Sequence, residues 1–226
     1  MMYDQFGSRI AAAYEMFSVS LVGAFTRSLL GRGVTRASVT EFQVACLRLQ
    51  ETLLSAAKAE SHVYEQQLGH WPDLMSFKQR EHDMLQSLRV LSFGNIAEMM
   101  GRFRKSSAKS VGMLNDGSAA LQELLKRKNA DALTSRDASG RLWTTATLIK
   151  VIARDFAYQA HIDATLACLK AQGDLVEVVY ADPTHEGHGR VLSISGAEGF
   201  TALDSVRAGI FHPNGTAGLA HHVRTE

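Results

Sequence analysis

The sequence has few of the features that secreted, membrane and disulfide-stabilised proteins need. It contains two cysteines, Cys46 and Cys168, in 226 residues. Each falls inside a helical pattern where a small apolar residue would serve, so we expect buried free thiols rather than a disulfide. No run approaches the ~18 uninterrupted apolar residues of a membrane helix. The N-terminus also lacks a charged segment followed by a compact apolar one, so we expect a soluble chain that is not exported.

A strong net charge and the common catalytic motifs are also missing. The chain has 24 Lys and Arg against 23 Asp and Glu, a net charge of +1. That balance indicates neither a nucleic-acid-binding protein nor an enzyme for acidic substrates. No Gly-x-Ser-x-Gly elbow, P-loop or Gly-x-Gly-x-x-Gly opening a helix occurs, so the usual signatures of hydrolases and nucleotide-binding enzymes are absent. We expect a folded protein that is not an enzyme.

Charge is nevertheless distributed unevenly along the chain. Eight basic residues stand against three acidic ones between Arg89 and Lys128, a local net charge of +5. From Asp174 onward three arginines face seven acids, a net charge of −4, and no lysine follows Lys170.

The basic residues after position 100 are candidates for contact with phosphates or with an acidic partner: Arg102, Arg104, Lys105 and Lys109. Several cations at one helix end can neutralise a DNA backbone without reading its sequence. The alternative is a solvated helix end whose cations face the C-terminal dipole. We favour a protein partner over DNA, because the flanking Met99, Met100 and Phe103 supply apolar anchors that DNA would not need.

Apolar residues recur at a helical period through most of the first 130 residues. The pattern predicts long helices over 6–30, 38–69 and 74–103. The second begins with a capping box of Ser38 and Glu41, and the third is weakened at Gly94 and Gly101. Further helices are expected over 118–129 and 145–172, with a polar turn at 134–140 between them.

The pattern changes after Gly173. Alternating, β-branched segments at 174–180 and 190–195 predict two strands, and a third short strand is expected around 208–212. The tail after Gly215 shows no periodicity. The fold class is therefore α+β: a mainly helical N-terminal bundle over 1–130, followed by a small α+β domain with a short β-sheet over 131–226.

Histidines gather in the C-terminal part, at His185, His188, His212, His221 and His222. A neutral imidazole is the commonest metal ligand, so His185, His188 and His212 are the candidates for a three-histidine site. No His-Glu-x-x-His helix or cysteine pair accompanies them, and we favour solvated or hydrogen-bonded loop histidines. An acid/base group of Asp182, His185 and Glu186 is the weaker alternative, because polar loops are commonly wet. We expect no metal and no cofactor.

Five short motifs follow one another in the second half of the chain. They read Asp137-Ala-Ser-Gly-Arg-Leu-Trp143, Val151-Ile-Ala-Arg154, Gly173-Asp-Leu-Val176, Gly189-Arg-Val-Leu-Ser-Ile-Ser-Gly196 and Gly209-Ile-Phe-His-Pro-Asn214. In this order they resemble the phage minor head proteins, also called minor capsid or head morphogenesis proteins, of tailed bacteriophages. The resemblance covers about Asp137 to His222, little more than a third of the chain. The residues that carry it are Asp137, Gly140, Arg141, Trp143, Arg154, Asp174, Gly189, Ser193, Gly196, His212, Pro213 and Asn214.

One departure from the family pattern concerns metal. Many relatives carry a Cys-x-x-Cys before the second strand and a cysteine directly after His-Pro-Asn, a set consistent with a metal clip. Here the loop runs from Ala181 to His188 without cysteine, and Gly215 follows His-Pro-Asn. We therefore expect the clip to be lost, with His185, His188 and His212 as the remaining candidate ligands.

The resemblance implies a structural virion component rather than an enzyme. It implies a minor head protein present in few copies at the portal vertex, made in the host cytoplasm and bound to the portal protein and other head proteins, with DNA contacted through phosphates in some members. Two alternatives stay open. One is an enzyme or toxin-like domain derived from a head protein, with the histidine loops as its site. The other is a generic helical scaffold or DNA-binding protein. We also expect Trp143 to be buried between the helix from Thr145 and the sheet.

Overall fold

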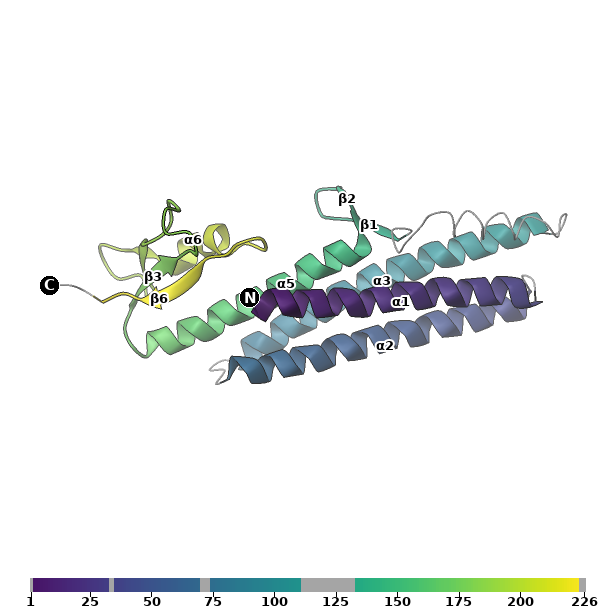
Figure 1. Cartoon of the computed structure of the whole chain (residues 1–226), viewed down its shortest axis with the longest axis horizontal. Helices are drawn as coiled ribbons and strands as arrows, with labels where there is room; N and C mark the ends of the chain where they lie inside the picture. Colours follow the sequence, from purple (N-terminus) through teal and green to yellow (C-terminus); the bar gives the residue numbers. More distant parts are fainter. Residues whose placement is uncertain (1, 33–34, 70–73, 111–132, 224–226) are drawn as a thin grey trace. The chain divides into compact units, whose positions relative to one another are not determined.

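The computed structural model describes residues 2–32, 35–69, 74–110 and 133–223. Within these ranges the chain is mainly helical, and a small mixed sheet follows near its C-terminus (Figure 1). The expected α+β class is confirmed. None of the helices in these ranges has the length and apolar character to cross a membrane. The expected helix at 118–129 and the domain boundary at 130/131 lie outside the described residues.

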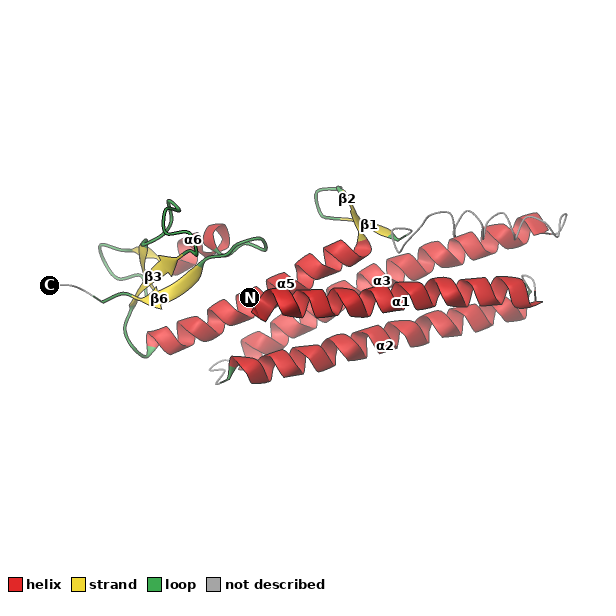
Figure 2. Cartoon of the chain, viewed as in Figure 1, coloured by secondary structure: helices red, strands yellow, loops and turns green. Residues whose placement is uncertain are grey.

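Long helices dominate the described ranges (Figure 2). They are α1 (Met2–Arg32), α2 (Arg36–Leu68), α3 (Leu74–Ser110) and α5 (Thr145–Lys170). Each covers a segment for which the apolar periodicity predicts a helix. A helix-length apolar stripe is a strong signal, because most helical stability in proteins comes from packing such a face.

The start of α2 differs from the expectation. The backbone N–H of Thr35 donates to Oγ of Ser38 (2.8 Å), and the N–H of Ser38 donates to Oγ1 of Thr35 (3.2 Å). These reciprocal bonds make Thr35 the N-cap, so the prediction of Ser38 as the first capping residue is wrong by one turn. Ser38 is the third residue of the helix. Its hydroxyl accepts the backbone N–H of Thr35, the bond that a Glu or Gln side chain makes at this position in the usual capping box.

Helix α3 continues through Gly94 and Gly101 to Ser110. An interior glycine costs about 1 kcal/mol relative to alanine, which is why the sequence marks both positions as weak. Buried side chains of the same helix lie on either side of Gly94, among them Leu88, Ile96 and Met99. Their packing offsets the cost and keeps the helix whole.

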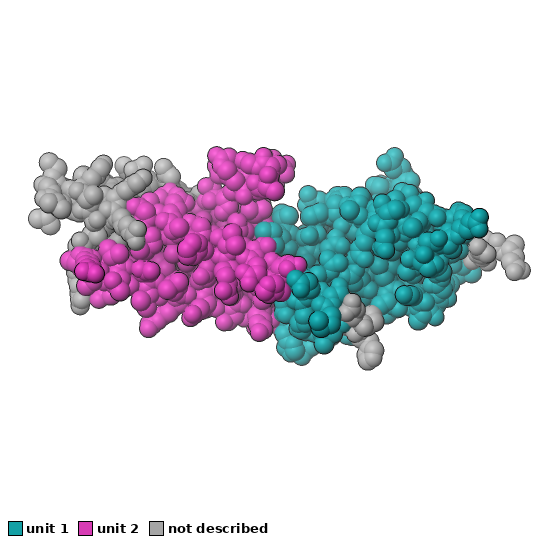
Figure 3. Space-filling view, turned by 180° about the vertical axis from the view of Figure 1, so that it is seen from behind, with its two compact units in different colours: residues 1–7, 62–81, 151–226 teal, residues 8–61, 82–150 magenta. Residues whose placement is uncertain are grey.

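The chain divides into two compact units (Figure 3). One comprises residues 1–7, 62–81 and 151–226, and the other comprises residues 8–61 and 82–150. We call them the sheet unit and the bundle unit. Segments far apart in the sequence therefore share a core, and residues 62–81 belong with the C-terminal sheet.

In the bundle unit, α1, α2 and α3 are tied by polar contacts as well as apolar packing. Asn95 of α3 donates a hydrogen bond to the hydroxyl of Tyr14 on α1. Burial raises the pKa of Tyr14 to about 12, as expected for a phenol held away from water. Phe25 and Phe42 pack edge to face between α1 and α2, with ring centroids 5.8 Å apart. Cys46 is buried nearby in α2 as expected, and burial raises the pKa of its thiol to about 11.

The core of the sheet unit is aromatic. Phe156 of α5 contacts Phe6 and Phe77, each with ring centroids 5.4 Å apart. Tyr64 packs on Phe6 at 5.1 Å and donates its hydroxyl hydrogen to the carbonyl of Ala157 (2.8 Å). The hydroxyl of this buried tyrosine therefore has a partner, as a buried polar group requires. Cys168, by contrast, is exposed, so the expectation of a second buried thiol is wrong.

The main sheet contains β3 (Leu175–Val179), β4 (Val191–Ser193), β5 (Thr201–Ala202) and β6 (Gly218–His221), in the order β5-β4-β3-β6. Strand β3 pairs antiparallel with both β4 and β6, whereas β4 and β5 are parallel. Val176 and Val178 point to the buried face, which matches the expected alternation of β3. The two strands predicted at 174–180 and 190–195 are present.

The third expected strand is wrong. Residues 203–210 form helix α6 (Leu203–Ile210), and the strand that completes the sheet is β6, in the tail that showed no pattern. Apolar residues at 203, 206 and 210 follow a helical spacing, and the Ile-Phe pair at the end of this stripe imitates a strand. The Gly-Leu-Ala-His sequence of β6 has no β-branched residue, and pairing with β3 makes it a strand.

A second, separate pairing occurs before α5. Strands β1 (Thr134–Arg136) and β2 (Leu142–Thr144) form an antiparallel hairpin where the sequence predicts only a turn. Its loop, 137–141, belongs to the first motif of the resemblance.

Candidate functional site

The first motif builds the loop of the β1–β2 hairpin. One carboxylate oxygen of Asp137 accepts the backbone N–H groups of Ser139 (2.9 Å) and Arg141 (3.0 Å), and the other accepts the indole N–H of Trp143 (2.9 Å). Hydrogen bonds from Ser139 and Trp143 hold the pKa of Asp137 well below its usual value. Gly140 adopts a φ of 80°, a left-handed conformation that favours glycine. Asp137 therefore organises the turn.

Trp143 is less buried than expected. Its side chain is half-buried on β2, and the guanidinium of Arg141 lies 5.6 Å from its ring. The expectation of a buried Trp143 ring is therefore wrong. Its indole N–H is committed to Asp137, which fixes the ring against its own hairpin.

The second and fifth motifs meet at Arg154 of α5. Its guanidinium donates to the carbonyl oxygens of Pro213 and Gly215 (3.0 Å for Gly215) and to Oδ1 of Asp4 in α1 (2.6 Å). We call this set of four residues the Arg154 clamp. The guanidinium also lies over the rings of Tyr3 and Tyr158, at 5.1 and 5.7 Å.

The clamp is electrostatically favourable. Partial burial raises the pKa of Asp4, but the hydrogen bond and charge of Arg154, together with the N-terminal amino group, outweigh it and hold that pKa below its usual value. A planar guanidinium suits this task because it offers five donors in a fixed fork. The Arg154 side chain is only 15% exposed, so these bonds form largely away from water.

Glycine is required at position 215 of the clamp because there is no room for a side chain. A Cβ atom at this position would lie 2.9 Å from the carbonyl oxygen of His212 and 3.2 Å from that of Ile210. The N–H of Gly215 donates to the same His212 carbonyl (2.7 Å), which closes the His212-Pro213-Asn214 turn. Pro213 and Asn214 suit such a turn, because proline fixes φ and asparagine can bond its own backbone.

The third and fourth motifs meet at Asp174 and Ser193. The hydroxyl of Ser193 donates to Oδ2 of Asp174, and the N–H of Ser195 donates to Oδ1 (2.8 Å). The Ser193 oxygen in turn accepts the N–H groups of Gly196 (2.8 Å) and Ala197 (2.7 Å). The bonds from Ser193 and Ser195 lower the pKa of Asp174. This chain of bonds fastens the end of β4 to the start of β3.

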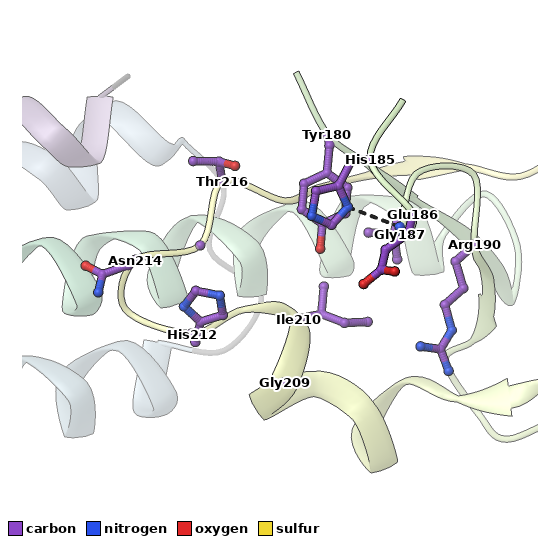
Figure 4. Close-up of a pocket in the computed structure, with 12 residues that line it drawn as sticks. Tyr180, His185, Glu186, Gly187, Arg190, Gly209, Ile210, His212, Asn214 and Thr216 are labelled. Carbon is purple, nitrogen blue, oxygen red and sulfur yellow. Dashed lines mark hydrogen bonds between the residues drawn. The ribbon is translucent and has the colours of Figure 1, made fainter. Parts of the chain in front are cut away.

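The histidine candidates do not form one ligand set. His185 and His212 line an open pocket of about 570 Å³ between the loop that follows β3 and the turn that follows α6 (Figure 4). His188 faces its own loop, where its Nδ1 accepts the N–H of Tyr180 (3.1 Å). Across the residues that the structure describes, no group of three or more His, Cys, Asp or Glu side chains could hold a metal ion.

The loop histidines are engaged in local structure. The His185 ring stacks on Tyr180 at 3.7 Å, and its Nδ1 accepts the N–H of Gly187 (3.0 Å), the bond drawn in Figure 4. Asp182 accepts the N–H and hydroxyl of Thr184, a turn that lowers the pKa of its carboxyl. Asp182 therefore organises a turn of this loop through one of its carboxylate oxygens. Gly189, with a φ of 79°, ends this loop.

The basic candidates lie on α3. Arg102 forms an ion pair with Glu98, one turn earlier in the helix. Arg104, Lys105 and Lys109 belong to the same helix by their backbone, and their side chains lie outside the described part. The prediction that Met99 and Met100 are apolar anchors for a partner is wrong, because their side chains are 0% and 8% exposed and belong to the core.

Sequence reasoning missed the partners of the motif residues. Asp4, Tyr3 and Tyr158 surround Arg154, but no local pattern links a residue at position 4 to a turn 210 positions away. Arg207 of α6 and Arg80 of α3 similarly converge on Asp163 of α5, with 2.9 Å between Arg80 and the carboxylate.

Comparison of the chain with protein-family models, with curated proteins and with solved structures finds no match in any of the three. The resemblance to phage minor head proteins therefore rests on the motif residues of the sequence alone.

Proposed function

We propose that the chain is a structural component of a virion, a minor head protein bound at the portal vertex of a tailed phage. The observation that carries the proposal is that motifs separated in the sequence contact one another. Arg154 of the second motif binds the fifth motif at Pro213 and Gly215, and Asp174 of the third binds Ser193 of the fourth. Contacts between motif residues are what a shared fold signature requires, and they support the proposal.

The chemistry of the motif residues also favours a structural role. Asp137, Arg154 and Asp174 all direct their charged groups at backbone atoms or turn side chains of this chain. Groups used in this way hold turns and strand ends in place. A catalytic group, in contrast, needs to be free to reach a reacting atom.

The helical part suits docking on an oligomeric partner. Helices α1, α2 and α3 each exceed 30 residues and so offer long rigid faces. The basic segment Arg102 to Lys109 supplies positive charge for an acidic face of the portal or for DNA phosphates.

The test is the protein content of the particles that form in cells carrying the phage. Virions and DNA-free proheads would be purified, and the chain quantified by mass spectrometry against the major capsid protein. The proposal expects a few copies in each virion and co-purification with the portal oligomer released from disrupted particles. If the chain stays in the cell lysate and is missing from both particles, the proposal fails. The alternatives of an enzyme and of a generic scaffold predict that result.

A further inference from the structure

Helix α3 exposes large apolar side chains in its middle, away from the buried stripe. Val90 is 68% exposed and Phe93 is 56% exposed. Residues three positions apart lie on one face of a helix, and Ala97, four positions beyond Phe93, is exposed on that face too. The buried residues Leu88, Ile96 and Met99 belong to the opposite stripe. Val90 and Phe93 thus form an exposed apolar pair on one face of α3, which a partner could cover.

Two glycines border this surface. Gly94 and Gly101 are separated by two helical turns, and a Cβ atom on either would meet none of the described residues within 4 Å. Packing within the described part of the chain therefore does not require glycine at these positions, although each costs helix stability. Small residues next to a bulky one allow the backbone of another helix to approach closely.

The surface is rigid. The side-chain amide of Gln50 on α2 donates to the backbone carbonyl of Arg89 (3.0 Å) and to the hydroxyl of Ser92 (2.8 Å). Ser92 and Asn95 are themselves buried in the bundle unit. Phe93 is thus presented by a helix that is held on both sides of it, and binding there requires little ordering.

Positive charge follows the surface along the same helix. From Arg89 to Lys109, α3 carries five basic residues, Arg89, Arg102, Arg104, Lys105 and Lys109, and one acid, Glu98, a net charge of +4. A partner that covers Phe93 therefore lies close to this net positive charge. Charge complementarity therefore favours an acidic partner.

We propose that Val90, Phe93, Gly94, Ala97 and Gly101, here called the Phe93 face, dock an acidic, amphipathic α-helix of the portal subunit. This proposal rests on the proposed function, since it names the surface by which the chain binds the portal. The apolar side chains of such a helix cover Val90 and Phe93, its backbone approaches at the glycines, and its carboxylates face the basic end of α3. DNA is the less suitable occupant, because a duplex presents phosphates and has no use for an exposed phenylalanine.

The experiment compares two matched double variants in binding to the purified portal oligomer of the same phage. Val90→Gln with Phe93→Gln removes the apolar character of the Phe93 face. Met16→Gln with Val19→Gln does the same on α1, where the side chains are 74% and 66% exposed. All four positions are exposed and glutamine is a good helix former, so both variants should keep the wild-type circular dichroism and thermal unfolding.

The expected result is a loss of portal affinity of about tenfold or more for the Val90/Phe93 variant and an unchanged affinity for the α1 variant. Equal affinities for wild type and the Val90/Phe93 variant, or equal losses in both variants, would overturn the Phe93 face as the docking surface. Arg89→Glu should slow association at low salt and have little effect at high salt. An unchanged association rate would overturn the acidic character of the partner.

The same measurements distinguish failure of this proposal from failure of the proposed function. If wild-type chain does not bind the portal oligomer, the proposed function fails, whatever the variants do. If it binds and the Val90/Phe93 variant binds equally well, only the docking surface is wrong. A 30-base-pair duplex of random sequence is the DNA arm: loss of duplex binding in the Val90/Phe93 variant, with portal binding intact, would assign the face to DNA and overturn the proposal.

Discussion

Arg154 of α5 and Asp4 of α1 are joined by a hydrogen bond of 2.6 Å, although 150 positions separate them in the chain. The same guanidinium holds the turn that ends the His212-Pro213-Asn214 motif through two carbonyl oxygens. The first turn of the first helix and a turn near the C-terminus thus depend on one side chain.

Replacing Arg154 with alanine should destabilise the sheet unit by about 2–3 kcal/mol, because two carbonyl groups and the Asp4 carboxylate lose a charged donor. The loss should be smaller than for a fully buried ion pair because Asp4 is 45% exposed. Urea unfolding followed by circular dichroism would measure the change. Arg154→Lys should recover only part of the loss, since one ammonium cannot replace a planar fork. A change below ~0.5 kcal/mol for Arg154→Ala would show that the clamp contributes little.

The Asp174 carboxylate should make stability depend on acid. Its pKa is lower in the folded chain than the unfolded value of about 3.9, so its contribution is fully present above that value and is lost as the pH falls through the folded pKa. We expect the melting temperature to fall from pH 5 to pH 2, and Asp174→Asn to weaken this dependence. Glu198→Gln, at an exposed position nearby, is the control. Parallel pH profiles for wild type and Asp174→Asn would contradict the prediction.

His188 should hold the N–H of Tyr180 within its loop. That N–H donates to Nδ1 of His188, so removal of the imidazole leaves it without its acceptor. We expect His188→Ala to speed amide hydrogen exchange at Tyr180, and His188→Asn to restore part of the protection because its side-chain oxygen is also an acceptor. Gly187, whose N–H donates to His185, is the internal control. Unchanged exchange at Tyr180 in His188→Ala would count against this role.

Trp143→Ala should cost less than a core truncation. A fully buried tryptophan loses about 3–5 kcal/mol on truncation, so a half-buried ring should lose roughly half of that. The loss should appear first as faster amide exchange in residues 134–144, because Asp137 loses its indole partner. Trp143→Phe keeps an aromatic ring without the indole N–H, so its stability should lie between those of the wild type and Trp143→Ala. Unchanged exchange across the hairpin would mean that the Asp137 turn is stable without the indole.

Purified protein should contain far less than one equivalent of zinc, and a chelator should leave its melting temperature unchanged. The reason is the missing cysteines together with the separate roles of His185 and His188 in the β3–β4 loop. Elemental analysis and thermal unfolding with and without chelator give the answer. Stoichiometric zinc that is lost in a His185→Ala, His212→Ala double variant would refute the expectation.

The long helices were predictable because their apolar periodicity extends over many residues. Stripes that repeat over 25 residues or more identify α1, α2, α3 and α5, while their ends depend on single hydrogen bonds such as Thr35 with Ser38. Short elements carry too few residues to show a period. Helix α6 and strand β6 were therefore missed, and β6 depends on pairing with β3 across 39 to 45 positions.

The motif residues were predictable, but their contacts were not. A sequence marks Arg154 and Asp174 as members of a pattern and cannot show that one meets Asp4 and the other Ser193. The same limit explains the error at Met99 and Met100, because a methionine beside a basic run looks the same whether it faces solvent or the core. Phe93 escaped notice for the opposite reason, since an apolar residue in a helical pattern is first assigned to the core.

The crowding at Gly215 has a consequence for substitution in the turn. A side chain at 215 would press on the carbonyl of His212, in the turn that Arg154 binds. Any residue other than glycine must therefore move the backbone that supplies Arg154 with its acceptors. One position without a side chain thus constrains residues on two helices, α1 and α5, and a change there is tolerable only together with compensating changes elsewhere in the turn.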